Sequence, residues 1–400
     1  MSDRSHVTPA PEGEFFESGR HAGVSILCGV LGILGLVASF ICGFIWPAEF
    51  GYSWLFAFIF FFTLCIGCLF WTIVHHAVDA EWSVVVRRQL ENIGLLMPLL
   101  GLLFLPVWFW RQYIYRWMNI PPGVDPVLDE KRAYLNWEFF LGRAVLFFVV
   151  LSVVAYLLRR YSVRQDRDGN PKFTIWMRRV SFTGLVAFAA CLTFAAFDWL
   201  MSLNWRWFST MWGPYIFAGV AGSSMGLLVL VIAALQKAGY LKGVVTIEHY
   251  HIMGKWLLTF TVFWAYIGFS QYMLYWYANI PEETQYFIVR NTESWNFLNW
   301  FLVIFRFFVP FALLLLRFTK KNITWICAIS AWIVLMQLLD MYIIVLPALH
   351  GTGVHVTFLN FLPLIGIGGT LAFFYLRLLA RTSLFPVRDP RLLDSLRLVN

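Results

Sequence analysis

Two arginines lie inside otherwise apolar stretches of the chain, and the residues around them repeat. Arg143 follows the tripeptide Leu-Asn-Trp at 135–137, and Arg306 follows the same tripeptide at 298–300, at the same distance. An arginine at mid-membrane costs about 2.5–3.5 kcal/mol on insertion scales and less near the interface. Each guanidinium therefore requires an acidic or carbonyl partner, and such intramembrane charges often mark ion or proton paths.

Two aspartates near the ends of later apolar stretches are the expected partners. We predict the pairs Arg143–Asp198 and Arg306–Asp340, or the equivalent pairs crossed between two halves of the molecule. Such a pair can simply tie helix ends together, or it can take part in proton transfer. Its duplication fits both functions, because duplication copies structure as well as function. Tyr342 is an uncharged candidate between the polar layers.

A second polar layer is predicted at the opposite ends of the same helices. Histidine exchanges protons near neutral pH, and a neighbouring carboxylate can tune it. His75 and Asp79 are four residues apart, which would place them on one helical face. These groups suit the mouth of a proton path, although helix ends are also where histidines and charges normally meet water. The residues of this layer are His75, His76, Asp79 and Glu81 in the first half, and Glu248, His249, His251 and Lys255 in the second.

The polar patterns belong to a longer internal repeat. Val84-Val85 and Gly94 recur as Val244-Val245 and Gly254, and the tripeptide Asn-Ile-Pro at 119–121 recurs at 279–281. Repeated polar patterns within apolar helices indicate an internally symmetric membrane protein. The offset between the copies is four predicted spans, which preserves direction, so the copies should be parallel and related by an axis along the membrane normal.

The composition sets the class of protein. Only 13% of the residues are charged and 60% are hydrophobic, whereas soluble domains are about one quarter charged. A net charge of +8 would suggest nucleic acid as a partner for a soluble protein, but here we expect loop arginines that fix membrane orientation and no nucleic acid. The apolar stretches predict about ten transmembrane helices. They lie near residues 22–46, 53–75, 93–113, 138–159, 179–201, 213–236, 254–277, 297–317, 323–346 and 355–379.

Charge asymmetry predicts the orientation of these spans. The termini and even-numbered loops hold 22 of the 30 lysines and arginines, and the segment 159–179 alone carries seven. The positive-inside rule then places both termini in the cytoplasm. The predicted fold is an all-α membrane protein with two parallel four-helix-bundle repeats, helices 2–5 and 6–9, flanked by helices 1 and 10. The corresponding segments are a terminal segment 1–21, helix 1 in 22–51, bundles 52–212 and 213–350, helix 10 in 351–380, and a cytoplasmic tail 381–400.

No redox cofactor is expected on this chain. All six cysteines fall inside apolar stretches, and Cys65-x-x-Cys68 lacks further cysteine or histidine ligands at metal-binding spacing. A bis-histidine haem needs histidines well inside at least two spans, whereas the eight histidines lie at termini, in loops or at predicted helix ends. Five aromatic residues form either an interfacial belt or the wall of a quinone headgroup pocket. They are Tyr113, Trp117, Tyr272, Tyr275 and Trp276.

With ten spans and a doubled bundle, the chain resembles the NrfD/PsrC superfamily, the membrane anchors of bacterial quinone-linked oxidoreductases. Three long stretches are especially similar to the ActF-type subunits of alternative complex III. They are 75–91 (HHAVDAEWSVVVRRQLE), 197–209 (FDWLMSLNWRWFS) and 271–283 (QYMLYWYANIPEE).

The resemblance implies a bacterial inner-membrane subunit of a quinol:cytochrome c, or other acceptor, oxidoreductase. It implies as partners an NrfD-like paralogous membrane subunit, an iron–sulphur subunit, a multihaem cytochrome c subunit, lipids and the quinol pool. Iron–sulphur clusters and haem c would lie on those partners, and the paralogue is the better candidate for the quinol site. We expect this chain to provide assembly surface and proton half-channels. The alternatives are a quinol-binding subunit, with Arg143, Asp198 and the aromatic residues around the headgroup, and a purely structural anchor.

Overall fold

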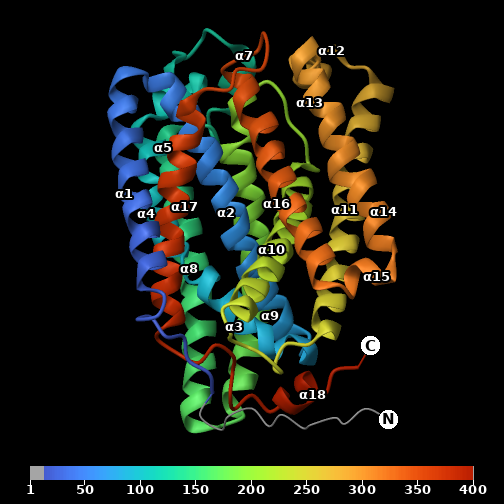
Figure 1. The fold of residues 1–400 in the computed structure, drawn as a ribbon. Helices are drawn as coiled ribbons and strands as arrows, with labels where there is room; N and C mark the ends of the chain where they lie inside the picture. Colours follow the sequence, from blue (N-terminus) through green and yellow to red (C-terminus); the bar gives the residue numbers. More distant parts are fainter. Residues whose placement is uncertain (1–12, 400) are drawn as a thin grey trace.

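The computed structural model describes residues 13–399, and every regular element within that range is a helix. Ten helical segments are long and apolar enough to cross a membrane, which confirms the predicted all-α membrane protein. The helices lie side by side, and the described chain begins and ends at the same end of the bundle (Figure 1). There the Leu384 amide donates to the Glu14 carbonyl. We call this the terminal end and the opposite one the far end.

The first repeat contains four spans, one of which is broken into short helices. Pro98 and Pro106 lie in the first turns of α4 and α5, where proline ends the preceding helical segment and begins the next. The elements of this half are α2 (Pro47–Ala77), η1 (Glu81–Ser83), α3 (Val84–Gly94), α4 (Met97–Leu103), α5 (Leu105–Phe109), α6 (Arg111–Ile114), η2 (Arg116–Asn119), α7 (Pro126–Lys131), α8 (Trp137–Asp168), α9 (Lys172–Trp199) and η3 (Met201–Asn204).

The second repeat follows the same order of spans. Its third span changes from α-helix to a π-helical turn, η4, and back. The elements are α10 (Trp212–Lys237), α11 (Ile247–Ala278), α12 (Pro281–Ile288), α13 (Glu293–Val303), η4 (Ile304–Phe308), α14 (Val309–Leu315), α15 (Arg317–Lys320), α16 (Ile323–Val345) and η5 (Leu346–Ala348).

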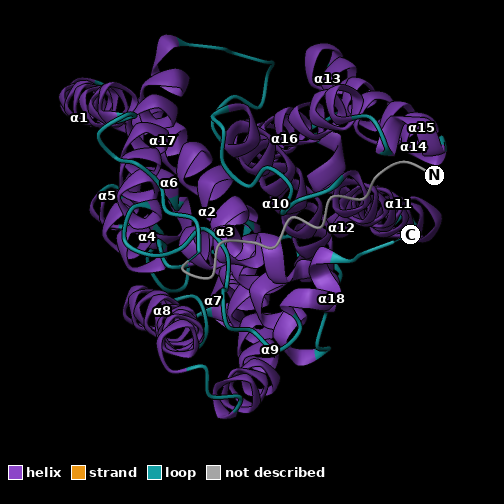
Figure 2. Ribbon diagram, turned by 60° about the horizontal axis from the view of Figure 1, so that its bottom comes forward, coloured by secondary structure: helices purple, strands orange, loops and turns teal. Residues whose placement is uncertain are grey.

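The two repeats pack in the same way. In the first, α2 contacts α3 and α9, and α8 packs against α9; in the second, α10 contacts α11 and α16, and α13 packs against α16. The contact between α2 and α10 joins the repeats, and these two helices lie in the middle of the molecule (Figure 2). They are also the two most buried spans. Polar side chains on them are therefore shielded from lipid.

Two flanking helices, α1 (Ala22–Ile45) and α17 (Phe358–Leu379), pack along each other and against α2. Glycines permit this close approach: a Cβ added to Gly35 would lie 2.5 Å from the backbone nitrogen of Gly366. After α17 the chain continues beneath the bundle to a last short helix, α18 (Leu392–Leu396). Of the predicted terminal segment 1–21, residues 1–12 lie outside the described residues.

Several predicted boundaries were wrong. Helix α1 ends at Ile45 and α2 begins at Pro47, so the change from flanking helix to bundle comes before the predicted residue 52. Proline at the first helical position has a preset φ and lacks only an N–H that would be unpaired there anyway. The third span begins at Glu81, well before the predicted residue 93. Its polar residues are paired inside the protein, so the segment need not be apolar.

The basic segment 159–179, predicted to be a long loop, is a helical hairpin. Helix α8 continues to Asp168 and α9 begins at Lys172. Gly169 ends α8 with a φ of +65°, a left-handed conformation that favours glycine. The side-chain oxygen of Asn170 then accepts from the Lys172 amide at 3.0 Å. Between the two helices only three residues remain, and both helices extend further toward the terminal end than predicted.

Candidate functional site

The first predicted pair forms near the far end. Arg143 Nε donates to Asp198 Oδ2 at 2.7 Å, and Nη2 donates to Oδ1 at 3.0 Å. Nη2 also donates to the Tyr134 carbonyl at 3.1 Å, and the guanidinium lies over the Tyr134 ring, 3.9 Å from its centroid. Helix α8 positions Arg143, because Asn136 caps its first turn by accepting from the Phe139 amide. The Asp198 side chain is fully buried, whereas 13% of the Arg143 side chain is exposed.

The second predicted pair also forms, and it is more enclosed. Arg306 Nη1 donates to Asp340 Oδ2 at 2.7 Å. Asp340 additionally accepts from the Tyr215 hydroxyl at 2.8 Å and from Trp264 Nε1 at 3.2 Å. The guanidinium lies 4.4 Å from the centroid of the Trp264 ring. Both side chains are almost completely buried, so this pair depends on protein partners rather than on water.

The two pairs are not equivalent, because Arg306 lies in the π-helical turn Ile304–Phe308 and Arg143 in a regular helix. Single π-turns within α-helices are frequent at functional sites. Here the turn lies between α13 and α14, and Arg306 contacts the side chain of Gln337 as well as Asp340. Gln337 Nε2 in turn donates to Thr63 Oγ1 on α2 at 3.4 Å. Arg306 is thereby connected to the first repeat.

Tyr342 is not part of the hydrogen-bonded connection from Arg306 through Gln337 to Thr63. Its hydroxyl donates to the His355 carbonyl at 2.7 Å, in the segment that leads to α17. Beside Arg306 there is instead a small cavity of about 10 Å³, close to the size needed for one water molecule. Ser223 and Thr261 contribute its hydroxyl groups. Uncharged polar groups from α10 and α11 therefore lie beside this pair, in addition to Gln337 from α16.

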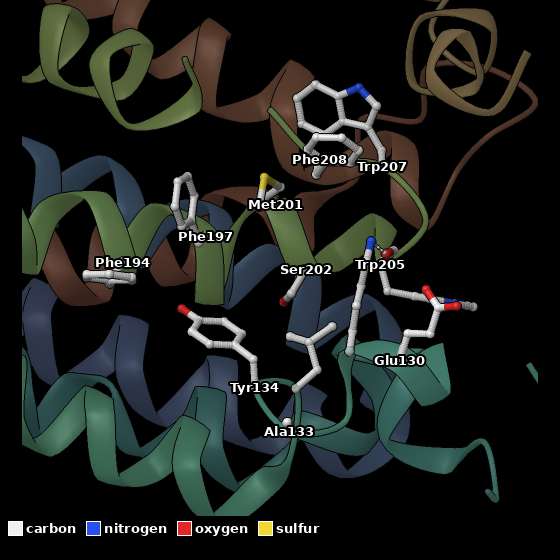
Figure 3. Close-up of a pocket in the computed structure, with 12 residues that line it drawn as sticks. Glu130, Ala133, Tyr134, Phe194, Phe197, Met201, Ser202, Trp205, Trp207 and Phe208 are labelled. Atoms are coloured by element: carbon white, nitrogen blue, oxygen red, sulfur yellow. Dashed lines mark hydrogen bonds between the residues drawn. The ribbon is translucent and has the colours of Figure 1, made fainter. Parts of the chain in front are cut away.

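A larger cavity of about 410 Å³ lies at the far end, beside the Arg143–Asp198 pair. Aromatic rings surround it, and Tyr134, which stacks on Arg143, forms one wall (Figure 3). Lys131 lines it and donates to the Trp205 carbonyl at 2.7 Å. The residues that line this cavity are Glu130, Lys131, Ala133, Tyr134, Leu135, Phe194, Phe197, Met201, Ser202, Trp205, Trp207 and Phe208.

The aromatic residues named from the sequence as a belt or a quinone headgroup wall do not line this cavity. None of Tyr113, Trp117, Tyr272, Tyr275 and Trp276 lines the cavity. Trp117 is buried in the first bundle, whereas Trp276 is 70% exposed on α11. Apart from Tyr134, the rings that do line the cavity come from the stretch 194–208, part of which carries the family resemblance.

At the terminal end, Glu91 is the centre of a buried charge cluster that sequence analysis missed. Its carboxylate accepts from Arg88 at 3.2 Å, from Arg159 at 3.3 Å and from the Ser162 hydroxyl at 2.8 Å. Arg87 Nε lies 3.7 Å from the same carboxylate. The Glu91 and Arg88 side chains are fully buried, and Arg88 also pairs with Asp166. Three guanidinium groups thus surround one carboxylate.

The candidate histidines of the first repeat lie against this cluster. His75 and His76 are buried, and none of their ring nitrogens has a hydrogen-bond partner among residues 13–399. His76 Nε2 lies 3.9 Å from Glu91 Oε1, and the His75 ring contacts the ring of Trp82. Buried polar atoms without partners are uncommon and call for a functional or solvent explanation. Of these two histidines, His76 is the one that lies beside the Glu91 carboxylate.

The prediction that His75 and Asp79 share a helical face was wrong. Helix α2 ends at Ala77, and Asp79 adopts a left-handed φ of +50°. The Ala80 amide then donates back to the His75 carbonyl, a common way to close a helix. Asp79 instead pairs with Arg178 and, at 2.6 Å, with Arg391. Glu81 lies in the following 3₁₀ turn and is exposed.

In the second repeat the candidate residues come together at the start of α11. His249 forms a capping box with Thr246, in which its Nδ1 accepts from the Thr246 amide at 3.0 Å. Glu248 accepts from Lys321 at 2.6 Å and lies 3.8 Å from His251 Nδ1. Lys255 follows one turn later and is exposed. This group is partly open to solvent, because one fifth of the Glu248 side chain is accessible.

The two terminal-end groups occupy matching positions but differ in charge. With the offset that relates Gly94 to Gly254, Arg88 corresponds to Glu248 and Glu91 corresponds to His251. In both repeats the side chains of the two residues lie close together, three positions apart along the helix. The second repeat therefore has a titratable histidine where the first has a carboxylate held by arginines.

The chain after α17, predicted to be a simple tail, covers the first of these groups. Its carboxylate Asp389 is buried, pairs with Arg87, and accepts from Arg391 Nε at 3.3 Å. Phe385 is also buried. Further hydrogen bonds join Thr382 to Arg159, Leu384 to Gln89 and Glu14, Val387 to Asp166, and Ser395 to Trp82. We call residues 380–396 the C-terminal strap.

We predict that Asp389→Asn loosens the strap. Burial raises the pKa of Asp389, but Arg87 and Arg391 outweigh it and hold the pKa well below its usual range. The carboxylate therefore stabilises the strap above the ordinary carboxyl pKa of about 4, and this stabilisation is lost only as the pH falls below that value. Losing the charge should speed hydrogen exchange at the amides of Leu384 and Val387 roughly a hundredfold at neutral pH.

Asp394→Asn is the control for this measurement, because Asp394 is exposed on α18 in the same strap. We expect exchange in that variant to match the wild type. Equal exchange rates in the Asp389→Asn variant and the wild type at neutral pH would show that the ion pair does not hold the strap. Lowering the pH of the wild type should reproduce the effect of the substitution, but only below about pH 4.

The missed residues had a signal in the sequence. Arg87, Arg88 and Glu91 have the three- and four-residue spacing of one helical face, next to the conspicuous His75-His76 pair.

Among residues 13–399, no group of three or more histidine, cysteine or carboxylate side chains could hold a metal ion. Comparison with models of known families finds no match to this chain, and comparison with curated proteins finds none either.

Proposed function

We propose that the chain is an integral membrane subunit of a bacterial quinol:acceptor oxidoreductase complex, and that it contributes proton-conducting half-channels and assembly surface. Membership of such a complex is inferred from the sequence resemblance, and the proton function is inferred from the buried polar groups. In it, the terminal end faces the cytoplasm, and the redox centres lie on iron–sulphur and multihaem cytochrome c partners. A paralogous NrfD-like subunit would oxidise the quinol.

The observation that carries the proton function is the connection around Arg306. Asp340, Arg306 and Gln337 form one hydrogen-bonded group that continues to Thr63 on α2 in the other repeat. A purely structural ion pair has no need for a polar contact that crosses between the bundles. At the other end of the same helices, His76 and His251 lie beside carboxylates. Titratable groups near both ends, with hydroxyl groups and a water-sized cavity between them, are what a half-channel requires.

A proton-pumping assay tests the proposal. We expect Asp198→Asn and Asp340→Asn, in the native complex reconstituted into vesicles, to lower the number of protons moved per quinol oxidised by at least half. Quinol oxidation itself should continue, because it takes place on partner subunits. Asp394→Asn serves as the control, since Asp394 is exposed outside both polar layers. Unchanged pumping in both variants would refute the half-channels, and purification of the chain without redox partners would refute the complex.

A second candidate function is quinol binding by this chain. The favouring observation is the aromatic-lined cavity of about 410 Å³, a volume within the range of small-molecule pockets. Ser202 lines it, and Arg143 stacks on the lining residue Tyr134, so these two polar groups could hold a polar headgroup. A photoreactive quinone analogue should then label residues 194–208. Labelling of the paralogous subunit alone would exclude this function.

A further inference from the structure

The hairpin of α8 and α9 is longer than the membrane requires. The two helices have 32 and 28 residues, which at 1.5 Å per residue correspond to about 48 and 42 Å. The hydrocarbon core of a bilayer is about 30 Å thick. The hairpin also reaches further than the neighbouring helices at the terminal end (Figure 1). Its last turns therefore lie at the level of the lipid headgroups and beyond.

The outer face of this hairpin has an apolar tier. Val149 and Val153 on α8 and Phe182 and Val186 on α9 are each about half exposed or more. On each helix these residues are three or four positions apart, so they form a continuous stripe. In a membrane such a stripe faces acyl chains.

A second tier, of basic and aromatic residues, follows the apolar tier toward the hairpin tip on the same faces of α8 and α9. Arg160 and Arg164 follow Val153 and Tyr156 on α8 at helical spacing, and Lys172 and Arg179 precede Phe182 on α9; all four cations are exposed. Between the helices, the ring of Tyr161 lies 6.1 Å from that of Phe173 and 6.3 Å from that of Trp176. The Arg179 guanidinium lies 5.5 Å from the centroid of the Trp176 ring. The aromatic rings thus bridge two groups of cations.

Three further charges near the tip pair with other parts of the chain, whereas Arg167 is exposed. Arg159 points inward to Glu91, Arg178 pairs with Asp79, and Asp166 pairs with Arg88. Asp168 is the exposed acidic side chain at the tip of the hairpin, and Glu138, which is also exposed, lies at the opposite end of α8. The exposed face at headgroup level is therefore strongly positive, with apolar surface directly adjoining it.

We propose that this face binds an anionic phospholipid, with its phosphate among Arg160, Arg164 and Arg179 and its acyl chains on the apolar tier. Charge complementarity selects an anionic headgroup, and an aromatic platform at the interface suits its glycerol and ester region. The apolar tier favours a lipid over an acidic soluble protein, which would contact only the tip. This inference is independent of the proposed proton and quinol functions.

Native mass spectrometry of the full-length protein tests the inference. Protein from nanodiscs of equal phosphatidylglycerol and phosphatidylcholine is released into detergent, and the retained lipid is counted. The wild type should retain phosphatidylglycerol preferentially. Each basic residue near a membrane surface contributes about fivefold in affinity, so the double variant Arg164→Gln/Arg179→Gln should weaken retention roughly 25-fold. High salt should weaken wild-type retention in the same direction.

The matched control is Lys242→Gln/Arg381→Gln, which removes two exposed cations at the same end of the molecule but outside the hairpin. We expect it to retain phosphatidylglycerol like the wild type. Equal losses in the two double variants would overturn the inference, because the effect would then follow net charge alone. A structure of the native complex with a protein subunit covering Arg164 and Arg179 would also overturn it, in favour of a protein partner. All four substitutions are at exposed positions, so unchanged thermal unfolding should accompany both outcomes.

Discussion

Replacing Glu91 by Gln should lower the free energy of unfolding by about 3–5 kcal/mol, the usual cost of removing one member of a buried ion pair. The carboxylate is fully buried, and the side chains of Arg87, Arg88 and Arg159 lie within 3.7 Å of it. Glutamine keeps the shape of the side chain but supplies no negative charge. The three guanidinium groups would then lie together, with Asp166 and Asp389 as the nearest remaining carboxylates.

The measurement is equilibrium unfolding in mixed micelles, followed by tryptophan fluorescence. Glu81→Gln is the control: it makes the same chemical change ten positions earlier in the same span, at an exposed residue. It should change the free energy of unfolding by less than about 0.5 kcal/mol. If Glu91→Gln were as mild as Glu81→Gln, the cluster would not depend on this carboxylate for charge balance.

The sequence predicted which residues would pair at the far end, because that prediction needs only burial and charge. Arg143 and Arg306 each lie in an apolar stretch, and each requires a carboxylate at matching depth. Asp198 and Asp340 are the aspartates that satisfy this requirement, and both pairs are confirmed. The duplication added the expectation that the two pairs would be alike. The two arginines do pair with equivalent aspartates, but the residues that surround the two pairs differ.

The sequence did not predict the cluster at the terminal end, because a stretch of four charged or amide side chains between residues 87 and 91 resembles a loop. Its residues are helical and buried because their partners come from distant parts of the chain. Arg87 meets Asp389 and Arg159 meets Thr382, both in the C-terminal strap. Pairings across such separations cannot be inferred from local spacing. The left-handed conformation of Asp79 was also unpredictable, since no glycine or proline marks the end of α2.

The lining of the far-end cavity shows the same limit in another form. The aromatic candidates were chosen because they lie near predicted helix ends, where aromatic belts are found. The cavity is lined mainly by residues of the connections before α8 and after α9. Their contact depends on hydrogen bonds such as that from Lys131 to the Trp205 carbonyl. Which connecting segments meet is a property of the folded bundle rather than of any one segment.

The unequal surroundings of the two arginine pairs predict unequal effects of removing the aspartates. Asp340→Ala should lower the free energy of unfolding by about 3–5 kcal/mol, because Arg306 is enclosed by protein and loses the carboxylate with which it pairs. Tyr215 and Trp264 would each lose a hydrogen-bond acceptor as well. Asp198→Ala should cost about 1–3 kcal/mol less, because part of Arg143 is exposed beside the large cavity, where water can replace the carboxylate.

Unfolding of both variants in the same mixed micelles measures this difference, and Asp394→Ala, at an exposed position on α18, provides the control. A charge-conserving variant, Asp340→Glu, separates loss of charge from loss of packing, since it should recover part of the stability if charge dominates. Equal costs for Asp198→Ala and Asp340→Ala would mean that water reaches both pairs equally. The surroundings of Arg306 in the π-helical turn would then exclude water no better than those of Arg143. The hydrogen-bonded connection from Arg306 through Gln337 to Thr63 would then add no measurable stability to the pair.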